Sequence, residues 1–425
     1  MSNVVSGQSA GLAARASKIL PGAAHDRPDV PAAFIGCVGT ISLHASDGLD
    51  AISDIWRAFQ VTAWHTPFQD IDWVTAWYEA AGRFNGHQPF VVLGYEDGEL
   101  RLILPLAVTG GGGLSKLCWL GQSANDYNAP VIDAEFAERC RRDLAEDIWT
   151  VVVDACGPID LIEFAQQPEH IAGRANAFIH RAAMPSSCSA HLVNLEPGWA
   201  EFYARLRGSK SRKRLREKFN KLARLGRLQF RGEKDPAVRR ALVRQAVAWK
   251  TQQLEASGDR NPFAPDNTFA DGVSEIERTL MTLCDAPGAR HKLRTDCLFL
   301  DGKAVAVIIA LVAGTRYSVF ISAHAADDTS RFSPGTILLV KTMQLACRAG
   351  YRKFDLLAGD EGYKMDWCDG HIGLWDDVRG LTMKGKAAAP LGRLARHIKK
   401  SLKEHPRVLD VVKRANKLRS ARNLI

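Results

Sequence analysis

The sequence predicts a mixed α/β fold made of two tandem units with the same architecture. Its 425 residues, 46% hydrophobic and 24% charged, suffice for two or three domains of ordinary size. The predicted elements occur twice in the same order: a helix, a two-stranded hairpin, a second helix and a strand. Such alternation predicts mixed sheets covered by helices. The repeat is inferred from element order, because identity between the two halves is not evident.

In the first half, apolar periodicity and turn residues define the elements. Asp97-Gly98 lies between two apolar segments and is a strong hairpin signal. The glycine run 110–113 predicts a flexible connection. The expected elements are a strand at 39–44, helices at 48–60 and 67–81, hairpin strands at 90–95 and 100–108, a helix at 134–156 and a strand at 161–165.

The second half repeats this order around a tight Asp301-Gly302 turn. The expected elements are helices at 199–225 and 237–257, strands at 228–231, 293–300, 304–312 and 316–322, a helix at 334–349 and a strand at 353–357. We therefore expect a flexible leader at 1–38, a first domain at 39–190, a second domain at 191–380 and a basic tail at 381–425.

Composition narrows the class of protein. No apolar run approaches the roughly 20 residues of a membrane span, and the first thirty residues lack the features of a secretory signal. Nine cysteines without CxxC spacing favour reduced thiols over disulfides or a metal site. We expect a cytoplasmic protein, with peripheral association at the inner membrane as an open alternative.

The net charge of +9 is concentrated in the tail, where residues 384–425 carry thirteen Lys and Arg against two acids. Apolar residues recur there at helical spacing: Leu391, Leu394, Ile398 and Leu402, then Val408, Val411, Val412 and Ala415. This basic amphipathic pattern suits an anionic membrane surface or an acidic partner. A solvated extension is the alternative.

A second basic cluster, residues 205–231, has twelve Lys and Arg against the single acid Glu217. It suits an anionic substrate or RNA, or it forms a solvated helical face that packs through its leucines and Phe219. Aromatic residues that could stack on bases are sparse, so we do not expect a nucleic-acid partner.

Ser333-Pro334-Gly335 precedes an apolar helical pattern. Serine favours the N-cap, proline suits the first helical position, and glycine permits close approach to the backbone. The first N–H groups of the helix, from Gly335, Thr336 and Ile337, are a candidate anion site. An ordinary capped helix is the alternative.

Polar residues crowd beyond the expected strand 353–357, which ends at Ala358-Gly359. Ligands of open α/β sheets bind at such carboxyl ends. The segments that carry a family resemblance are Ser318–Ser322, Ser333-Pro334-Gly335, Phe354-Asp355, Gly359-Asp360, Tyr363-Lys364 and Trp367, with looser matches at Pro67-Phe68-Gln69, Trp73, Trp77, Leu104-Pro105-Leu106, Asp126-Tyr127 and the helix containing Arg212, Arg214, Leu215 and Arg216.

These segments, spread over roughly residues 45 to 375, resemble the CelD-like acyltransferases. That family belongs to the GCN5-related N-acetyltransferase (GNAT) superfamily and is linked to cellulose and exopolysaccharide gene clusters. Its tandem fold is shared with the Fem-type peptidoglycan-bridge aminoacyl transferases, which use charged transfer RNA. The resemblance implies two GNAT-like domains and an acyltransferase that uses acetyl-CoA or another acyl-CoA.

The resemblance also implies where coenzyme A would bind. Its pyrophosphate would lie at the start of the 334–349 helix and its pantetheine arm along the strand 316–322. The expected cofactor contacts are Ser322, Arg331, Ser333, Gly335 and Thr336. The usual superfamily loop is longer and richer in Arg, Gln and Gly than this segment, which leaves charged transfer RNA open as the donor.

Acyl transfer needs a base for the attacking amine or hydroxyl and a donor for the developing oxyanion. We favour Asp360 as the base, with Asp355, Glu361 and His324 as alternatives. Lys364 would hold an anionic acceptor or a carboxylate, and Tyr363 would reprotonate the leaving thiolate. The expected acceptor contacts are Arg212, Arg216 and Trp367.

The predicted acceptor is a small molecule or a cell-envelope or exopolysaccharide precursor. Two other functions stay open, a ligase dependent on aminoacyl transfer RNA and a non-catalytic binding module of a polysaccharide synthesis system.

Overall fold

The computed structural model describes residues 31–405, except Pro197, Arg260, 265–268, Ala270, Pro287, 289–291 and Asp360. The chain divides into two compact units. Unit 1 comprises Met1–Tyr78, Gly82–Ser186 and Gly373–His397, and unit 2 comprises Glu79–Ala81, Ser187–Ile372 and Ile398–Ile425. The segment Gly373–His397 thus groups with unit 1, whereas the sequence predicted one domain over 191–380.

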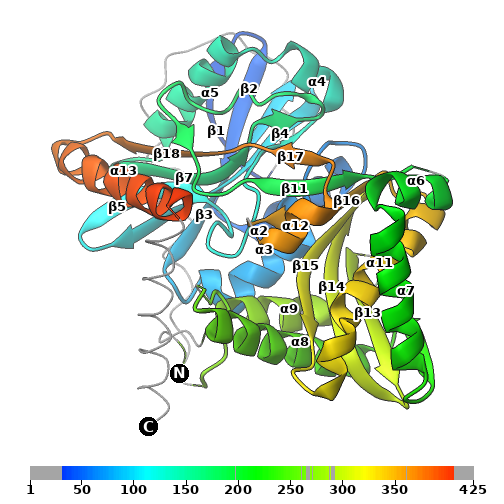
Figure 1. Cartoon of the computed structure of the whole chain (residues 1–425). Helices are drawn as coiled ribbons and strands as arrows, with labels where there is room; N and C mark the ends of the chain where they lie inside the picture. The colour runs from blue at the N-terminus through cyan, green and yellow to red at the C-terminus, as the bar shows by residue number, and fades with distance from the viewer. Residues whose placement is uncertain are drawn as a thin grey trace, which may run out of the picture. The chain divides into compact units, whose positions relative to one another are not determined.

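Unit 1 is built on a mixed sheet with the strand order β1-β2-β3-β4-β5-β7-β18-β10, and β6 pairs with β4 (Figure 1). Neighbouring strands are antiparallel except β5 and β7, which run parallel. The bounds are β1 (Ala33–Val38), β2 (Ile41–Ser46), β3 (His87–Glu96), β4 (Glu99–Gly111), β5 (Leu114–Trp119), β6 (Val131–Ile132), β7 (Leu161–Pro168), β10 (Met184–Pro185) and β18 (Leu374–Gly380), with a separate ladder of β8 (His170–Ile171) and β9 (Arg174–Ala175).

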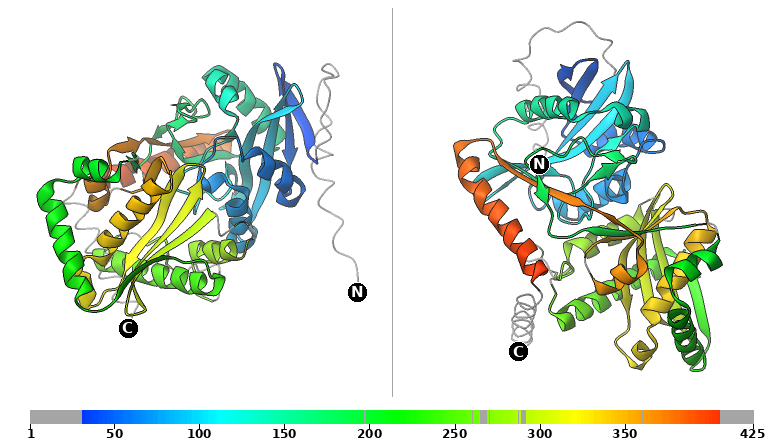
Figure 2. Two further views of the ribbon diagram at one scale, coloured as in Figure 1. Left: turned by 90° about the vertical axis from the view of Figure 1, so that its right-hand side faces the viewer. Right: turned by 45° about the horizontal axis from the view of Figure 1, so that its top comes forward.

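The helices of unit 1 are α2 (Leu49–Phe59), α3 (Ile71–Trp77), α4 (Ala134–Arg139) and α5 (Arg142–Ala155), and the chain of β18 continues into α13 (Met383–Glu404) (Figure 2). Helices α2, α4 and α5 pack against the unit 1 sheet, and α3 packs on α2. Trp149 of α5 packs on Phe164 of β7, with ring centroids 5.0 Å apart. Aromatic packing of this kind fixes α5 on the sheet.

Several expected elements of unit 1 are confirmed and others differ. Asp97 and Gly98 have φ angles of 51° and 77°, as a two-residue hairpin turn requires, so the hairpin is confirmed. The expected helix 134–156 breaks at Cys140, which is extended. The expected helix 67–81 is a 3-10 turn (Pro67–Gln69), then α3, then a π-helical turn (Tyr78–Gly82), because Thr66 and Asp70 each cap a new start.

Two segments expected to be flexible are ordered. Strand β1 lies inside the predicted leader and pairs with β2. The glycine run 110–113 is a hairpin between β4 and β5, with Gly112 and Gly113 at positive φ.

Unit 2 is built on a second mixed sheet, in the order β12-β13-β14-β15-β16-β11-β17. Only β15 and β16 run parallel among its described neighbours. The bounds are β11 (Ala190–Asn194), β12 (Leu228–Gly232), β13 (Leu293–Leu300), β14 (Lys303–Ala313), β15 (Arg316–His324), β16 (Lys353–Ala358) and β17 (Gly370–Ile372).

Helices cover both faces of this sheet, α8 and α9 on one side and α11 with α7 on the other (Figures 1 and 2). Their bounds are α6 (Trp199–Leu206), α7 (Ser209–Ala223), α8 (Pro236–Ser257), α9 (Glu275–Asp285), α11 (Pro334–Arg348) and α12 (Gly362–Trp367). The expected helix 199–225 is two helices, because Arg207 is extended with φ −133° and ψ 124°.

The two units share one plan, which confirms the predicted mixed α/β fold with tandem repeats. In each, antiparallel strands lead through a helix to a strand that runs parallel to the last of them, β5 to β7 and β15 to β16. No helix among the described residues is long and apolar enough to cross a membrane.

Candidate functional site

The parallel pair of unit 2 opens into a fork. β15 and β16 pair only through Arg316–Lys353, Tyr317–Phe354 and Ser318–Asp355, although β15 continues to His324 and β16 to Ala358. Beyond these three pairs, no described strand pairs with the edge of β15 that faces β16 or with the edge of β16 that faces β15. A strand edge carries a row of backbone donors and acceptors, so the fork can bind an extended amide-containing chain.

We call β15 the upper arm of the fork and β16 the lower arm. Asp355 shapes the lower arm. Its side chain is fully buried, it accepts from Arg316 Nη1 at 2.8 Å, and its other oxygen accepts from the Leu357 N–H at 2.8 Å. Leu357 has a φ of 61°, which is rare for a branched residue. The carboxylate therefore holds a bend at the end of β16, and its two oxygens are already engaged, which argues against Asp355 as the base.

The start of α11 follows the upper arm. Pro334 occupies its first turn as predicted, but Ser333 has a φ of 56° and makes no side-chain cap. Its hydroxyl instead accepts from Lys218 Nζ at 2.6 Å. The Ile337 N–H bonds to the Ser333 carbonyl at 3.1 Å, so it does not contribute to an anion site as predicted. Gly335 and Thr336 remain as first-turn residues, with a lysine beside them.

The predicted cofactor residues fall in two places. Ser322 lies on the β15 arm of the fork, while Ser333, Gly335 and Thr336 lie at the start of α11. Arg331 ends a 3-10 turn (Asp328–Phe332), where its guanidinium lies 4.9 Å from the Phe332 ring centroid.

His324 connects the upper arm to the start of α11. A Cβ added to Gly335 would lie 3.1 Å from the His324 ring, so only glycine fits there without movement.

The predicted catalytic residues lie on α12, beyond the lower arm, apart from Asp360, which is outside the described residues. Lys364 is 4% exposed, and its Nζ donates to the Ala358 carbonyl at 2.7 Å and pairs with Glu361 at 2.8 Å. Burial alone would raise the pKa of Glu361, but the Lys364 ammonium, a backbone hydrogen bond and the Lys250 charge together hold that pKa below its usual value. Lys364 therefore holds a carboxylate, one of its two predicted roles.

Tyr363 keeps its proton at neutral pH. Burial of the hydroxyl raises its pKa, and the Glu361 charge adds to the effect, although the side chain as a whole is 37% exposed. The predicted role as an acid needs a protonated phenol, but a raised pKa makes that phenol a weaker proton donor, so the role stays a prediction.

Lys250 of α8 is a site residue that the sequence reasoning missed. Burial lowers its pKa, and the nearby Glu361 carboxylate partly offsets the shift. On the same helix, Gln253 Nε2 donates to the His324 carbonyl at 3.1 Å, which ties α8 to the end of β15. The available signal was spacing, because Lys250 continues the buried stripe of Val243 and Ala246 at helical intervals.

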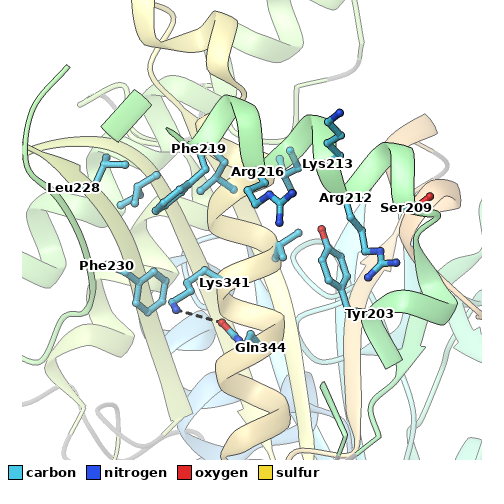
Figure 3. A pocket seen from close by; sticks show the side chains of 14 residues that line it. Tyr203, Ser209, Arg212, Lys213, Arg216, Phe219, Leu228, Phe230, Lys341 and Gln344 are labelled. Carbon is cyan, nitrogen blue, oxygen red and sulfur yellow. Dashed lines mark hydrogen bonds between the residues drawn. The ribbon is translucent and has the colours of Figure 1, made fainter. Parts of the chain in front are cut away.

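The predicted acceptor residues are not one surface. Trp367 is 4% exposed and stacks on Tyr203, with the Arg207 guanidinium 4.5 Å from its ring centroid. It is a packing residue. Arg212 and Arg216 line a separate cavity of about 810 Å³ between α7 and α11 (Figure 3).

The corresponding fork of unit 1 is filled. β5 and β7 pair only at Lys116–Leu161 and Leu117–Ile162. Beyond them, the Gln122 amide accepts from the Ala165 N–H at 2.9 Å and donates to the Glu163 carbonyl at 3.0 Å. In unit 2, side chains also reach β16 beyond the separation, since Asp355 accepts from the Leu357 N–H and Lys364 donates to the Ala358 carbonyl. The open part of the unit 2 fork is therefore on β15, to which no described strand adds beyond Ser318.

Comparison with family models identifies one segment of the chain. Residues 209–365 match the acetyltransferase (GNAT) domain. Unit 2 carries a GNAT-type acetyltransferase domain. The matched segment begins with α7 and ends inside α12, so it contains the fork, the start of α11 and Lys364.

Solved structures resemble the chain over most of its length. FemX is 11% identical with a TM-score of 0.52, over 76% of this chain and 95% of that chain. The C-terminal domain of a putative lysylphosphatidylglycerol synthetase from Agrobacterium fabrum is 16% identical, with a TM-score of 0.42 over 76% and 95%. A tandem GNAT protein from the clavulanic acid pathway is 11% identical, with a TM-score of 0.40 over 80% and 99%. The likeness to FemX shows a shared fold. No curated protein matches the sequence.

Proposed function

We propose that unit 2 transfers an acyl group, acetyl in the simplest case, from a coenzyme A thioester to an amine or hydroxyl. The acceptor would be a small molecule or a cell-envelope or exopolysaccharide precursor, as the CelD-like resemblance implies. The observation that carries the proposal is the open fork between β15 and β16, with the start of α11 beside its upper arm.

These parts suit the two halves of the donor. The pantetheine arm contains amides, which can pair with the edge of β15 beyond Ser318, where no described strand adds. A pyrophosphate is stabilised by first-turn amides of a helix and by its dipole, and Lys218 adds a positive charge next to Ser333.

The transfer step forms a bond from the acceptor nitrogen or oxygen to the thioester carbonyl carbon and breaks the carbon–sulfur bond. The acceptor's proton passes to a base, and the thiolate receives one from an acid. Tyr363 is the acid that the sequence favours; its raised pKa keeps the proton on the phenol and makes it a weaker donor than an ordinary tyrosine. Asp360 remains the base that the sequence favours, and Lys250 is a second candidate because burial favours its neutral form.

Calorimetry with coenzyme A and acetyl-coenzyme A tests the donor. We expect binding by the natural chain and at least about 10-fold weaker binding by Gly335→Val, whose side chain would meet His324. Lys218→Ala should weaken binding by a similar factor, since it removes a charge-assisted contact worth roughly 1.5–3 kcal/mol. Lys221→Ala, an exposed lysine on the same helix, is the matched control. Equal affinity in all three variants would remove the fork as the donor site.

Thioester turnover with Asp360→Asn and Lys364→Ala tests the chemistry in the same preparation. Loss of a positioned acid or base costs on the order of 10²-fold in rate. Unchanged turnover in both variants would eliminate these residues while leaving the donor site intact.

Charged transfer RNA is the second candidate donor, favoured by the largely exposed basic side chains of α7. Binding of charged transfer RNA without binding of coenzyme A would establish it. If neither binds, unit 2 is a non-catalytic module.

A further inference from the structure

The cavity between α7 and α11 is lined by none of the residues to which the proton transfers are assigned. Its walls are one face of each helix, at positions separated by three, four and seven residues, and its floor comes from β12 and β13. The apolar residues that line it are Leu215, Phe219, Leu228, Phe230, Leu298, Ile337 and Val340. At about 810 Å³ it lies within the roughly 300–1,000 Å³ of small-molecule pockets.

The way α7 is held explains why the space stays open. Among its described side chains only Leu222, near its end, is buried. The helix is tied instead by polar contacts, Lys218 to Ser333 and, just before its start, Arg207 to the Asp366 carbonyl at 2.7 Å. Phe219 therefore remains 42% exposed although it faces apolar neighbours. Such an unfilled apolar space gains stability when a matching ligand enters.

The charged residues at the cavity are all cationic, beside the uncharged polar residues Tyr203, Ser209 and Gln344. Arg212, Lys213, Arg216 and Lys341 line it, and no carboxylate does. Figure 3 shows Arg216 directed into the space between the helices and Lys213 directed away. The Nε of Arg212 is buried and has no hydrogen-bond partner among the described residues. Arg212 and Arg216 line the cavity, and guanidinium groups make strong charge-assisted hydrogen bonds to carboxylates and phosphates, so an anionic ligand would be favoured there.

We propose that this cavity binds a single hydrocarbon chain ending in an anionic head group, a carboxylate or a phosphate. The chain would lie on the apolar floor, and the head would bind between Arg212 and Arg216. The basic tail of the protein is a poor occupant, because residues 384–425 are strongly cationic themselves. RNA is disfavoured because the floor is apolar and offers its backbone no partners. The proposal does not depend on which donor unit 2 uses.

Calorimetry on the full chain tests it with three probes below their micelle-forming concentrations: laurate, dodecyl phosphate and dodecyl maltoside. We expect micromolar binding of at least one anionic probe and at least about 10-fold weaker binding of the neutral one. Preference between laurate and dodecyl phosphate assigns the head group. Equal affinity for all three would overturn the head-group site, and no binding would overturn the proposal.

Variants separate the cavity from general surface charge. Arg212→Ala and Arg216→Ala should each weaken binding of the anionic probe about 10-fold. Val340→Trp, which adds bulk to the α11 wall of the cavity, should abolish binding. Arg214→Ala, an exposed arginine of the same helix outside the cavity, should bind as the natural chain does. Thermal unfolding checks that each variant folds. An equal loss of probe affinity in Arg214→Ala, or displacement of the probe by RNA, would show nonspecific charge attraction and would overturn the proposed binding site.

Discussion

Asp355 shows how one buried carboxylate can set the geometry of the fork. Removing it leaves the Arg316 guanidinium, 21% exposed, without its paired charge and leaves the Leu357 N–H without this acceptor. Breaking such a pair costs about 3–5 kcal/mol. We therefore expect Asp355→Ala to lower the free energy of unfolding in urea by about that amount. Asp355→Asn keeps an acceptor for Leu357 and should cost less. Equal costs would mean that the bend does not depend on this bond.

Burial of Lys250 predicts how the stability of the protein depends on pH. Its pKa in the folded protein is lower than in the unfolded chain, because burial disfavours the charged form. The unfolded state then binds more protons between the two pKa values, so stability rises with pH as that window is crossed towards 10.5. Lys250→Met should remove this rise and stabilise the protein at neutral pH, raising Tm by about 2–4 °C if the gain is about 1 kcal/mol.

Lys221→Met is the control for this substitution, because Lys221 is exposed and its removal should leave the pH dependence unchanged. If Lys250→Met loses thioester turnover while its Tm rises, Lys250 would be a residue that lowers stability but is needed for activity. A Tm that falls in Lys250→Met would contradict the assignment of a destabilising buried ammonium.

At the scale of elements, local patterns predicted most of what lies close along the chain. The hairpin at Asp97-Gly98 and the strand at 293–300 appear as expected. Long-range pairings were not predictable: β18 pairs with β7 across more than 200 residues, and β11 lies between β16 and β17. Neither strand has a turn signal that links it to its partner, so no local pattern could place it.

The candidate site also has parts that local sequence predicts and parts that depend on contacts distant along the chain. The start of α11 was predictable from Ser333-Pro334-Gly335, since capping preferences are local, although the αL conformation of Ser333 was not. The fork depends on where two strands separate, and the Lys364–Glu361 pair depends on how α12 turns back on β16. Such relations are tertiary, and for Lys364 the family resemblance supplied the only guide.

For the whole molecule, repetition of the fold does not mean repetition of the site. Both units contain a parallel pair that separates after two or three residues. In unit 1 the Gln122 amide bonds to β7 beyond the separation, and in unit 2 Asp355 and Lys364 do the same on β16. No described strand adds to β15 beyond Ser318. A buried strand edge must be satisfied by some partner, and in unit 2 an extended ligand can be that partner. The same plan thus supports a structural unit and a binding unit.

The α13 helix bears on the predicted membrane association of the whole chain. One face is fixed on the unit 1 sheet, where Ala389 is buried and Arg393 donates to the Val378 carbonyl at 2.9 Å. Leu391, Leu394 and Ile398 recur at helical spacing and are exposed by 48–70%. The residues expected to continue this pattern beyond 405 lie outside the described residues. An exposed apolar stripe on a basic helix is typical of segments that lie on anionic membranes.

Because part of α13 belongs to the fold, substitution of the stripe is a cleaner test than truncation of residues 384–425. The triple variant Leu391→Ser, Leu394→Ser, Ile398→Ser should sediment with anionic phospholipid vesicles at least about 10-fold more weakly than the natural chain, since each buried apolar side chain contributes roughly 1.5–3 kcal/mol. Val61→Ser with Phe84→Ser removes exposed apolar surface elsewhere and should bind normally. Binding that falls with added salt in the natural chain supports the electrostatic component. If the triple variant sediments as the natural chain does, α13 is a helix that only covers the unit 1 sheet. The cavity between α7 and α11 would then be the candidate lipid contact that remains in the described part of the chain.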